Sequence, residues 1–321
     1  MKLIVKIAAI AALALALPGG AYAQDDYPSE PLKIIVPTDP GGSVDNLARI
    51  FQRTIDEMDI YPSVVIVNQP GAGGTIGTRS VKDADPDGYT IGLWHPGIIT
   101  SNAMGVANYN HAAFTVLGGT GLTELGMGVL DSSDLKTPQD LIDQSMKNPG
   151  SITVATNIGL PVHFIPMMFQ AEAGIDMKFV QIGGGSKRLA SILGGHTDTG
   201  LFSVSEFKSY AESGLRPLFL YSEKRDPDLP DIPTAKESGV DISINDFRVW
   251  LAPKGVEPEI AAKIVETLKA VLEDADVKEQ LAELSINPAW LSTDDVLGRL
   301  NDMDERSRPL VEAARAMANS K

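Results

Sequence analysis

From Leu32 onward the chain repeats one unit: a short run of β-forming residues, a loop of small residues, and a helical pattern. The first copy comprises the run Leu32–Pro37, the loop 38–43, and apolar residues from Val44 to Met58 at helical spacing. Further runs of this kind cover residues 64–67, 89–94, 152–155, 178–182, 199–204 and 216–221. Strands that alternate with helices of this length predict an α/β fold, with parallel sheets covered by helices on both faces.

Chain length predicts two domains. The 321 residues exceed what one hydrophobic core usually covers, and no obvious flexible linker divides them. Without a linker, we expect two interleaved domains with two chain crossings. The expected first domain comprises residues 24–119 and 222–321, and the second comprises 120–221. Near the C-terminus, Ser292–Asp295 predicts a capping box that opens the last helix.

The first 23 residues have the pattern of a cleavable signal peptide. Lys2 and Lys6 accompany the apolar run 7–17, and Ala21-Tyr22-Ala23 is the small-x-small pattern that a signal peptidase accepts. The apolar run is short for a hydrocarbon layer of roughly 30 Å, and a start-anchored membrane helix is the alternative. We therefore expect export, with a mature chain that begins at Gln24.

Composition restricts the partners. The absence of cysteine excludes disulfides, thiolate metal sites and a Cys nucleophile, and an exported chain without disulfides fits a bacterial periplasm. The formal net charge is −15, and removal of Lys2 and Lys6 makes it more negative. Such a charge repels nucleic acid and anionic membrane surfaces, so we expect neither as a partner. Any anion site must therefore depend on local hydrogen-bond donors.

Three glycine-rich loops, at residues 40–43, 71–75 and 183–186, lie at strand-to-helix junctions. In an open parallel sheet these junctions form the carboxyl edge, where ligands bind. The backbone N–H groups of a first helical turn carry partial positive charge, so such a loop can hold a carboxylate without Arg or Lys. The alternative is that these glycines only form tight turns.

Motifs for nucleotides, metals and nucleophilic catalysis are missing. A G-x-G-x-x-G pattern beginning at Gly71 fails at Ile76, and no phosphate-binding P-loop follows, so we expect no cofactor. No serine lies in a G-x-S-x-G context. The histidines lack the spacing of a metal site, and none is expected; they are His95, His111, His163 and His196.

Several side chains beside the loops are candidates with two interpretations. His95 ends a strand and His163 opens a helix, and each either faces a cleft or is a hydrogen-bonded structural histidine. Asp45 lies in the first turn of a helix, where the helix dipole favours an acid; direct solute contact is the other interpretation. Trp94 and Phe202 at strand ends either wall a pocket or pack in the core.

An ordered set of motifs extends from Tyr27 to about Arg315. It comprises the segments 27–37, 40–45, 48–49, 68–77, 86–90, 148–150, 194–198 and 225–239. In this order they resemble the periplasmic substrate-binding proteins of tripartite tricarboxylate transporters, often called the Bug family. The resemblance implies a type II-like, two-domain periplasmic-binding-protein fold, in which two interleaved α/β domains close over a solute. It also implies membrane permease subunits as partners.

The resemblance further implies that the first two glycine loops hold a carboxylate through backbone N–H groups, while the second domain meets the rest of the solute. Together with the candidates above, the expected ligand-binding set is Thr38, Asp39, Gly41, Gly42, Ser43, Asp45, Gly71, Gly73, Gly74, Thr75, Trp94, His95, Thr156, Pro161, His163, Gly183, Gly184, Gly185, Phe202 and Ser203. The chain departs from the family at Thr38-Asp39 and at Gln181-Ile182. Asp39 beside the first loop would repel a carboxylate there and attract an amine.

We therefore expect a non-enzymatic, monomeric solute-binding protein of the periplasm that binds a small organic carboxylate. Two alternatives use the same scaffold. One is a sensor module that presents its closed form to a receptor kinase. The other is an enzyme with His163 or His95 as acid or base, which the missing nucleophile and base pair disfavours.

Overall fold

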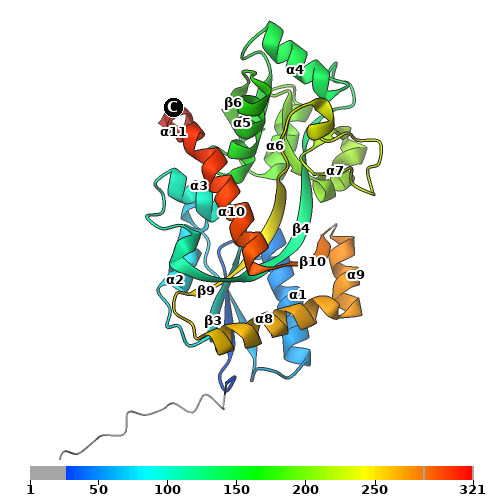
Figure 1. Cartoon of the computed structure of the whole chain (residues 1–321). Coiled ribbons are helices and arrows are strands. Elements are labelled where there is room, and N and C mark those ends of the chain that lie inside the picture. Colours follow the sequence, from blue (N-terminus) through cyan, green and yellow to red (C-terminus); the bar gives the residue numbers. More distant parts are fainter. Residues whose placement is uncertain (1–26, 285, 320–321) are drawn as a thin grey trace, which may run out of the picture.

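The computed structural model describes residues 27–284 and 286–319 (Figure 1). The expected signal peptide, residues 1–23, lies outside the described residues. The strands are β1 (Leu32–Val36), β2 (Val64–Asn68), β3 (Thr90–Trp94), β4 (Phe114–Leu130), β5 (Thr153–Thr156), β6 (Lys178–Gln181), β7 (Thr199–Ser203), β8 (Leu215–Leu220), β9 (Asn245–Pro253) and β10 (Asn287–Leu291). The α-helices are α1 (Ser43–Glu57), α2 (Thr75–Lys82), α3 (Gly97–Ala103), α4 (Pro138–Lys147), α5 (Pro161–Ala173), α6 (Gly185–Leu193), α7 (Val204–Tyr210), α8 (Pro258–Glu273), α9 (Ala275–Glu283), α10 (Thr293–Ser307) and α11 (Val311–Asn319).

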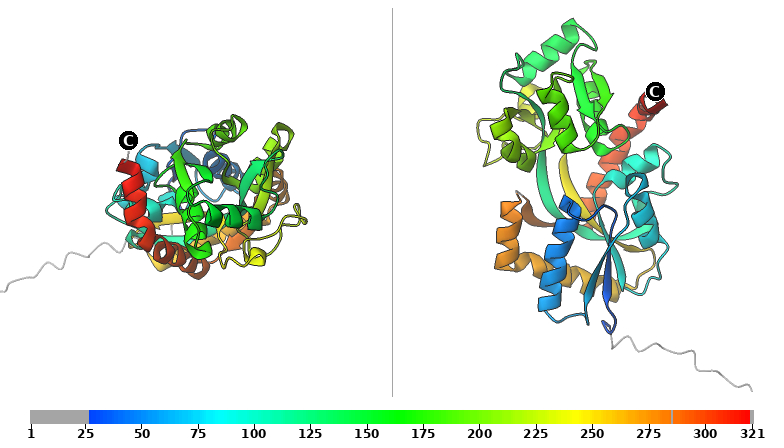
Figure 2. Two further views of the ribbon diagram at one scale, coloured as in Figure 1. Left: turned by 90° about the horizontal axis from the view of Figure 1, so that it is seen from above. Right: turned by 180° about the vertical axis from the view of Figure 1, so that it is seen from behind.

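Two groups of parallel strands form two lobes. The first lobe is built around β1, which pairs in parallel with β2 and β3. The second lobe is built around β5, which pairs in parallel with β6 and β7. Both groups confirm the strand-helix units expected from the sequence. Figure 2 shows the lobes one above the other, with helices on the faces of each.

Antiparallel strands join the two lobes, which the sequence pattern did not predict. Residues 114–124 of β4 pair with β9, and residues 125–130 of β4 pair with β7 and β8. The strand order is therefore β2-β1-β3-β9-β4-β7-β5-β6, with β8 and β10 also on β4. The partner of β4 thus changes between Glu124 and Leu125, so this strand carries the chain from one lobe to the other.

Two other segments connect the lobes. The chain returns from β8 to β9 through residues 221–244, the crossing segment. The two ends of this segment are hydrogen-bonded to each other, because the Ile244 N–H donates to the Tyr221 carbonyl at 2.8 Å. Helix α10 lies across the front of both lobes and contacts α3 and α5 (Figure 1). The expected domain limits, 24–119 with 222–321 and 120–221, stay a prediction.

Helical amphipathicity explains how α1 is placed. Its apolar residues at helical spacing face the sheet, and Phe51 packs against Trp250 of β9 with ring centroids 5.0 Å apart. Burial of such a stripe is the main source of stability for a surface helix. The predicted capping box is confirmed, because the Ser292 hydroxyl accepts from the Asp295 N–H and the Asp295 carboxylate accepts from Ser292. The helix that it opens, α10, is not the last one, because α11 follows it. Among the described residues, no helix has the length and apolar character needed to span a membrane.

Candidate functional site

The first glycine loop is held in shape by Asp45. This buried carboxylate accepts hydrogen bonds from the Gly41 N–H, the Arg49 guanidinium and the Asn68 amide, each at 2.8 Å. Burial opposes ionisation, but these three donors hold the pKa of Asp45 below its ordinary value. Asp45 therefore uses its oxygens to shape the loop, which matches the structural interpretation of this residue.

The side chains before the loop differ in their surroundings. The Thr38 carbonyl accepts from Asn68 at 3.1 Å, while its hydroxyl is buried without a hydrogen-bond partner among the described residues. Asp39 is exposed. Gly42 precedes α1, so the N–H groups of the first turn of that helix lie directly after the loop.

Arg248 of β9 brings a positive charge to the same loop. Its buried guanidinium donates to the Ser43 hydroxyl at 3.3 Å and to the Asp246 carboxylate at 2.6 Å. Arg248 was not among the predicted site residues, because the sequence pattern showed no strand at residues 245–253 and gave no reason to place this side chain near the loop.

The second glycine loop has left-handed backbone conformations at Gly73 and Gly74, and Trp94 packs closely against it. Gly74 has φ +86°, and a Cβ there would lie 2.1 Å from the Trp94 indole. Gly73 has φ +63°, and its Cβ would meet Ser101 at 3.4 Å and Leu160 of the second lobe at 3.6 Å. The backbone conformation therefore favours glycine at both positions, and the close approach of Trp94 requires it at Gly74. Thr75 is buried, and its hydroxyl donates to the Ala72 carbonyl at 2.9 Å.

Trp94 and His95 form a stacked pair below this loop, with ring centroids 3.9 Å apart. The His95 Nδ1 accepts from the Gly97 N–H at 2.9 Å. Burial lowers the pKa of His95 to about 4, although the Asp246 carboxylate opposes this shift. His95 is therefore neutral near pH 7 and cannot supply a positive charge to an anion.

In the second lobe, the start of α5 is fixed by Thr156, whose hydroxyl donates to the Val162 carbonyl at 2.8 Å. His163 is fully buried against Phe164 and Phe179. Its Nδ1 accepts from the Gly159 N–H at 3.3 Å, and burial lowers its pKa to about 4. These contacts match the structural interpretation of His163, and a direct contact with solute stays a prediction.

The third glycine loop faces an acidic side chain. A Cβ at Gly185 would lie 1.9 Å from Glu206 Oε1, so a larger residue cannot occupy this position without moving Glu206. Glu206 accepts from the Ser203 N–H at 2.9 Å and lies 3.5 Å from the Arg188 guanidinium. Arg188 also donates to the Gly183 carbonyl at 3.1 Å.

Phe202 is buried beneath Arg188, whose guanidinium lies 5.2 Å from the ring centroid. Its packing matches the core interpretation. Arg188 and Glu206 were not predicted, because their contact depends on how α6 and α7 meet. The turn signal Gly183–Gly185 could locate the loop but not the two charges beside it.

A cavity of about 180 Å³ lies between the lobes. Of the predicted site residues, His95 and Pro161 line it, and Gly73 approaches its wall at Leu160. The other predicted residues gather around the three loops, or are buried in the second lobe, as His163 and Phe202 are. Within residues 27–284 and 286–319, no group of His, Cys, Asp or Glu could hold a metal ion.

Two α/β lobes with glycine loops and a cavity between them define a two-domain solute-binding protein of the periplasmic-binding-protein type. Residues 47–315 match the tripartite tricarboxylate transporter family receptor, TctC. The chain belongs to this family, whose members are solute-binding receptors and not enzymes. A relative from Agrobacterium vitis, the UPF0065 protein in the TAR-I ttuE-ttuC' intergenic region, is 31% identical over 87% of this chain and 82% of its own.

Solved structures agree on the fold. A TctC solute-binding protein from Polaromonas has a TM-score of 0.78 at 24% identity, covering 89% of this chain and 99% of its own. The periplasmic binding protein BugD has a TM-score of 0.71 at 26% identity, covering 90% of this chain and 98% of its own. An R. palustris protein solved with adipate has a TM-score of 0.75 at 25% identity, covering 90% and 98%.

Proposed function

We propose that this protein captures a small organic carboxylate between its lobes in the periplasm and delivers it to the permease subunits of a tripartite tricarboxylate-type transporter. The observation that carries the proposal is that the second glycine loop of the first lobe lies beside the interdomain cavity, where a Cβ at Gly73 would meet Leu160 of the cavity wall at 3.6 Å. Adipate in a related structure supports a carboxylate as the solute. Export through cleavage of residues 1–23 belongs to the same proposal.

Backbone donors are the expected anchors of the carboxylate. The loops at Gly41–Ser43 and Gly71–Thr75 each lead into a helix, where N–H groups lack partners within the helix. Arg248 adds a buried cation beside Ser43. These groups supply the local donors that a chain of strongly negative net charge needs in order to hold an anion.

Closure is expected to occur about β4 near Glu124 and about the crossing segment 221–244. At Glu124 the pairing of β4 changes from β9 to β7 and β8, and the crossing segment lies between the ends of β8 and β9, where hinges commonly fall. The division into 24–119 with 222–321 and 120–221 is part of this proposal. A saturating ligand should then make the particle more compact in small-angle scattering.

The direct test is a thermal-shift screen of mono-, di- and tricarboxylates and amino acids on the purified mature protein. A ligand at 100 times its dissociation constant stabilises a protein by about 2.7 kcal/mol. With an unfolding entropy of roughly 2.1 cal/mol/K per residue, the melting temperature should rise by about 4 °C. Native mass spectrometry should detect a co-purified acid. If no carboxylate shifts the melting temperature, the proposal fails.

A further inference from the structure

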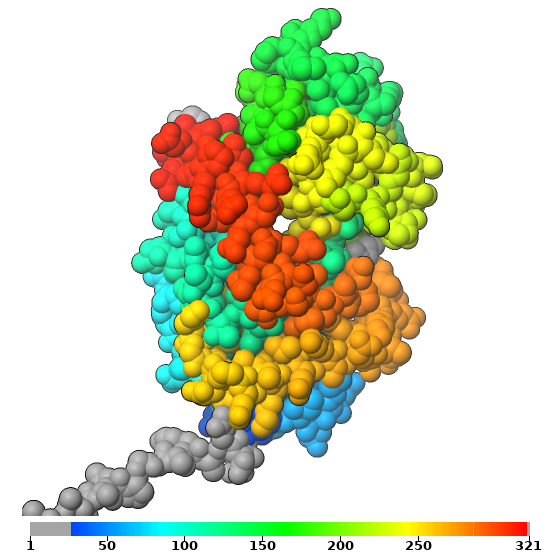
Figure 3. All heavy atoms as spheres, in the orientation of Figure 1, coloured from blue at the N-terminus to red at the C-terminus, as the bar shows by residue number. Residues whose placement is uncertain are grey.

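The interdomain cavity is lined mainly by apolar side chains. Both lobes, the crossing segment 221–244 with the start of β9, and α10 contribute to the wall. In Figure 3 the surface is hollowed between α10 and the yellow crossing segment. Apolar side chains that form the wall include Leu125, Leu160, Val162, Ile165, Leu201 and Phe247.

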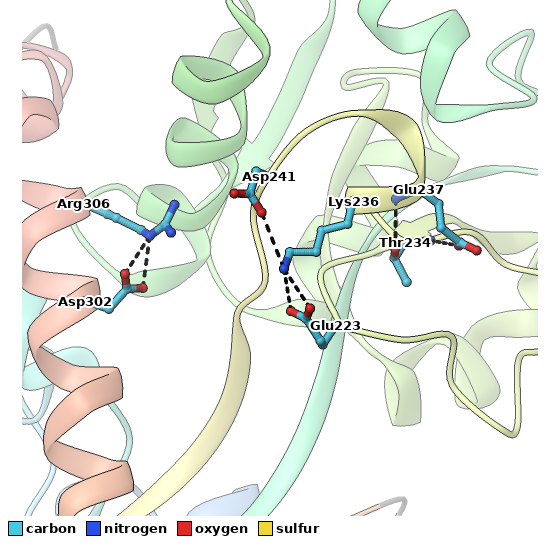
Figure 4. A network of polar contacts seen from close by, with 7 residues as sticks. All are labelled: Glu223, Thr234, Lys236, Glu237, Asp241, Asp302 and Arg306. Atoms are coloured by element: carbon cyan, nitrogen blue, oxygen red, sulfur yellow. Dashed lines mark hydrogen bonds and ion pairs between the residues drawn. The ribbon is translucent and has the colours of Figure 1, made fainter.

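The polar side chains in this wall already have protein partners. Asp246 pairs with Arg248 at 2.6 Å, and Asp302 pairs with Arg306 at 2.9 Å. Figure 4 shows the Asp302–Arg306 pair on α10, opposite the crossing segment. In the crossing segment, Lys236 forms ion pairs with Glu223 and Asp241. The remaining polar lining residues are also bonded within the protein: Ser243 to Glu223, Asn245 to Glu124 and Arg299, and His95 to the Gly97 N–H.

The cavity begins beside the second glycine loop. Leu160, part of its wall, lies 3.6 Å from the Cβ position of Gly73. His95, another part of its wall, stacks on Trp94, which lies against Gly74. A solute whose carboxylate is held by this loop therefore has an apolar space next to it, and not a second polar site.

We propose that the solute carries an apolar body, a ring or chain of about six carbon atoms, which fills this cavity. The inference rests on the proposed function, because the glycine loops hold the carboxylate. The volume of about 180 Å³ is sufficient, since an apolar cavity of about 150 Å³ binds benzene. With its polar groups already paired, the wall gains more from apolar contact than from the hydroxyl or carboxylate groups of a compact polar acid.

The first test is a calorimetric series on the wild-type protein, using straight-chain monocarboxylates from acetate to heptanoate, then benzoate, succinate, adipate and citrate. Each added methylene should tighten binding about fourfold until the cavity is full. Adipate should therefore bind more than tenfold tighter than succinate. Benzoate should bind tighter than acetate by a similar or larger factor.

The second test fills the cavity. Val162→Phe adds a ring to its wall and should weaken heptanoate and benzoate by at least tenfold, while acetate changes little. Val65→Phe makes the same change on an exposed valine of β2, which is 43% exposed, and should leave the series unchanged. Val162→Ala, which enlarges the cavity, should keep the preference for long chains.

The outcomes separate the two claims. If citrate or succinate binds but chain length has no effect, the apolar body is refuted and the proposed function stands. If none of these acids binds, both the apolar body of the solute and the proposed function are refuted. If Val162→Phe does not fold, the wild-type series and Val162→Ala decide the question.

Discussion

The guanidinium of Arg248 donates a hydrogen bond to the Ser43 hydroxyl at 3.3 Å, which joins β9 to the first turn of α1. Residues 205 positions apart in the sequence thus meet at the first glycine loop. This contact places the buried Arg248 guanidinium beside the backbone N–H groups of the first turn of α1, which have no partners within the helix. The loop therefore combines backbone donors with one side-chain charge.

Arg248→Lys should weaken carboxylate binding by about tenfold or more. Lysine keeps the charge but has one nitrogen in place of the two that reach Asp246 and Ser43, and a hydrogen bond to a charged group contributes about 1.5–3 kcal/mol. Calorimetry with the tightest acid of the screen measures the effect. Arg308→Lys, at an exposed arginine of an i,i+4 pair, is the control and should bind as wild type does. Equal affinities for the wild type, Arg248→Lys and Arg308→Lys would show that Arg248 does not contribute to carboxylate binding.

Gly185→Ala should destabilise the second lobe, because its new methyl group would displace the Glu206 carboxylate. We expect a loss of about 1 kcal/mol in the free energy of unfolding, measured with urea, because the displaced carboxylate gives up its hydrogen bond with the Ser203 N–H. Gly184→Ala is the control, since no atom lies within 4 Å of its Cβ position. In a Glu206→Ala background the cost of Gly185→Ala should fall, and an unchanged cost would show that Glu206 is not the obstacle.

Much of this arrangement follows from local sequence. The strand-helix units predicted β1 with α1 and β5 with α5, because apolar periodicity and small-residue loops are local signals. The glycine loops were predicted at the edge where the structure places them. At Gly74 the reason is now visible, because the Trp94 indole fills the space of its missing Cβ.

The strands that join the lobes could not be predicted in the same way. β4 contains five glycines between Phe114 and Leu130, which obscure its alternation of polar and apolar residues. The structure explains them through distant partners: a Cβ at Gly118 would lie 2.2 Å from Trp290, and one at Gly126 would lie 2.5 Å from the Phe219 carbonyl. For the same reason, the charges at Arg188, Glu206 and Arg248 depend on tertiary contacts.

Glu124 should make stability depend on pH. Burial raises its pKa from 4.5 to about 7, although a hydrogen bond from Asn245 opposes the shift. Between these values the folded protein binds more protons than the unfolded chain, so the contribution of Glu124 to stability falls as pH rises from about 4.5 to 7. At about 1.4 kcal/mol per pKa unit, the loss is up to about 3 kcal/mol.

Glu124→Gln, which keeps an acceptor for Asn245, should therefore be more stable than wild type at pH 8 and no more stable at pH 4.5. Urea unfolding at the two pH values measures the difference. Glu259→Gln, at an exposed glutamate of α8, should show no such change. A difference for Glu124→Gln that is the same at both pH values would contradict the raised pKa.

The most direct measurement of the central claim compares two glycine variants by titration calorimetry. Gly73 and Gly174 both have φ +63°, so alanine imposes the same backbone strain at each. Gly73 faces the interdomain space, whereas no atom lies within 4 Å of the Cβ position of Gly174. If the second glycine loop holds the carboxylate, Gly73→Ala should weaken its binding at least tenfold and Gly174→Ala should leave it unchanged. Equal affinities for both variants and the wild type would show that the solute does not bind against this loop.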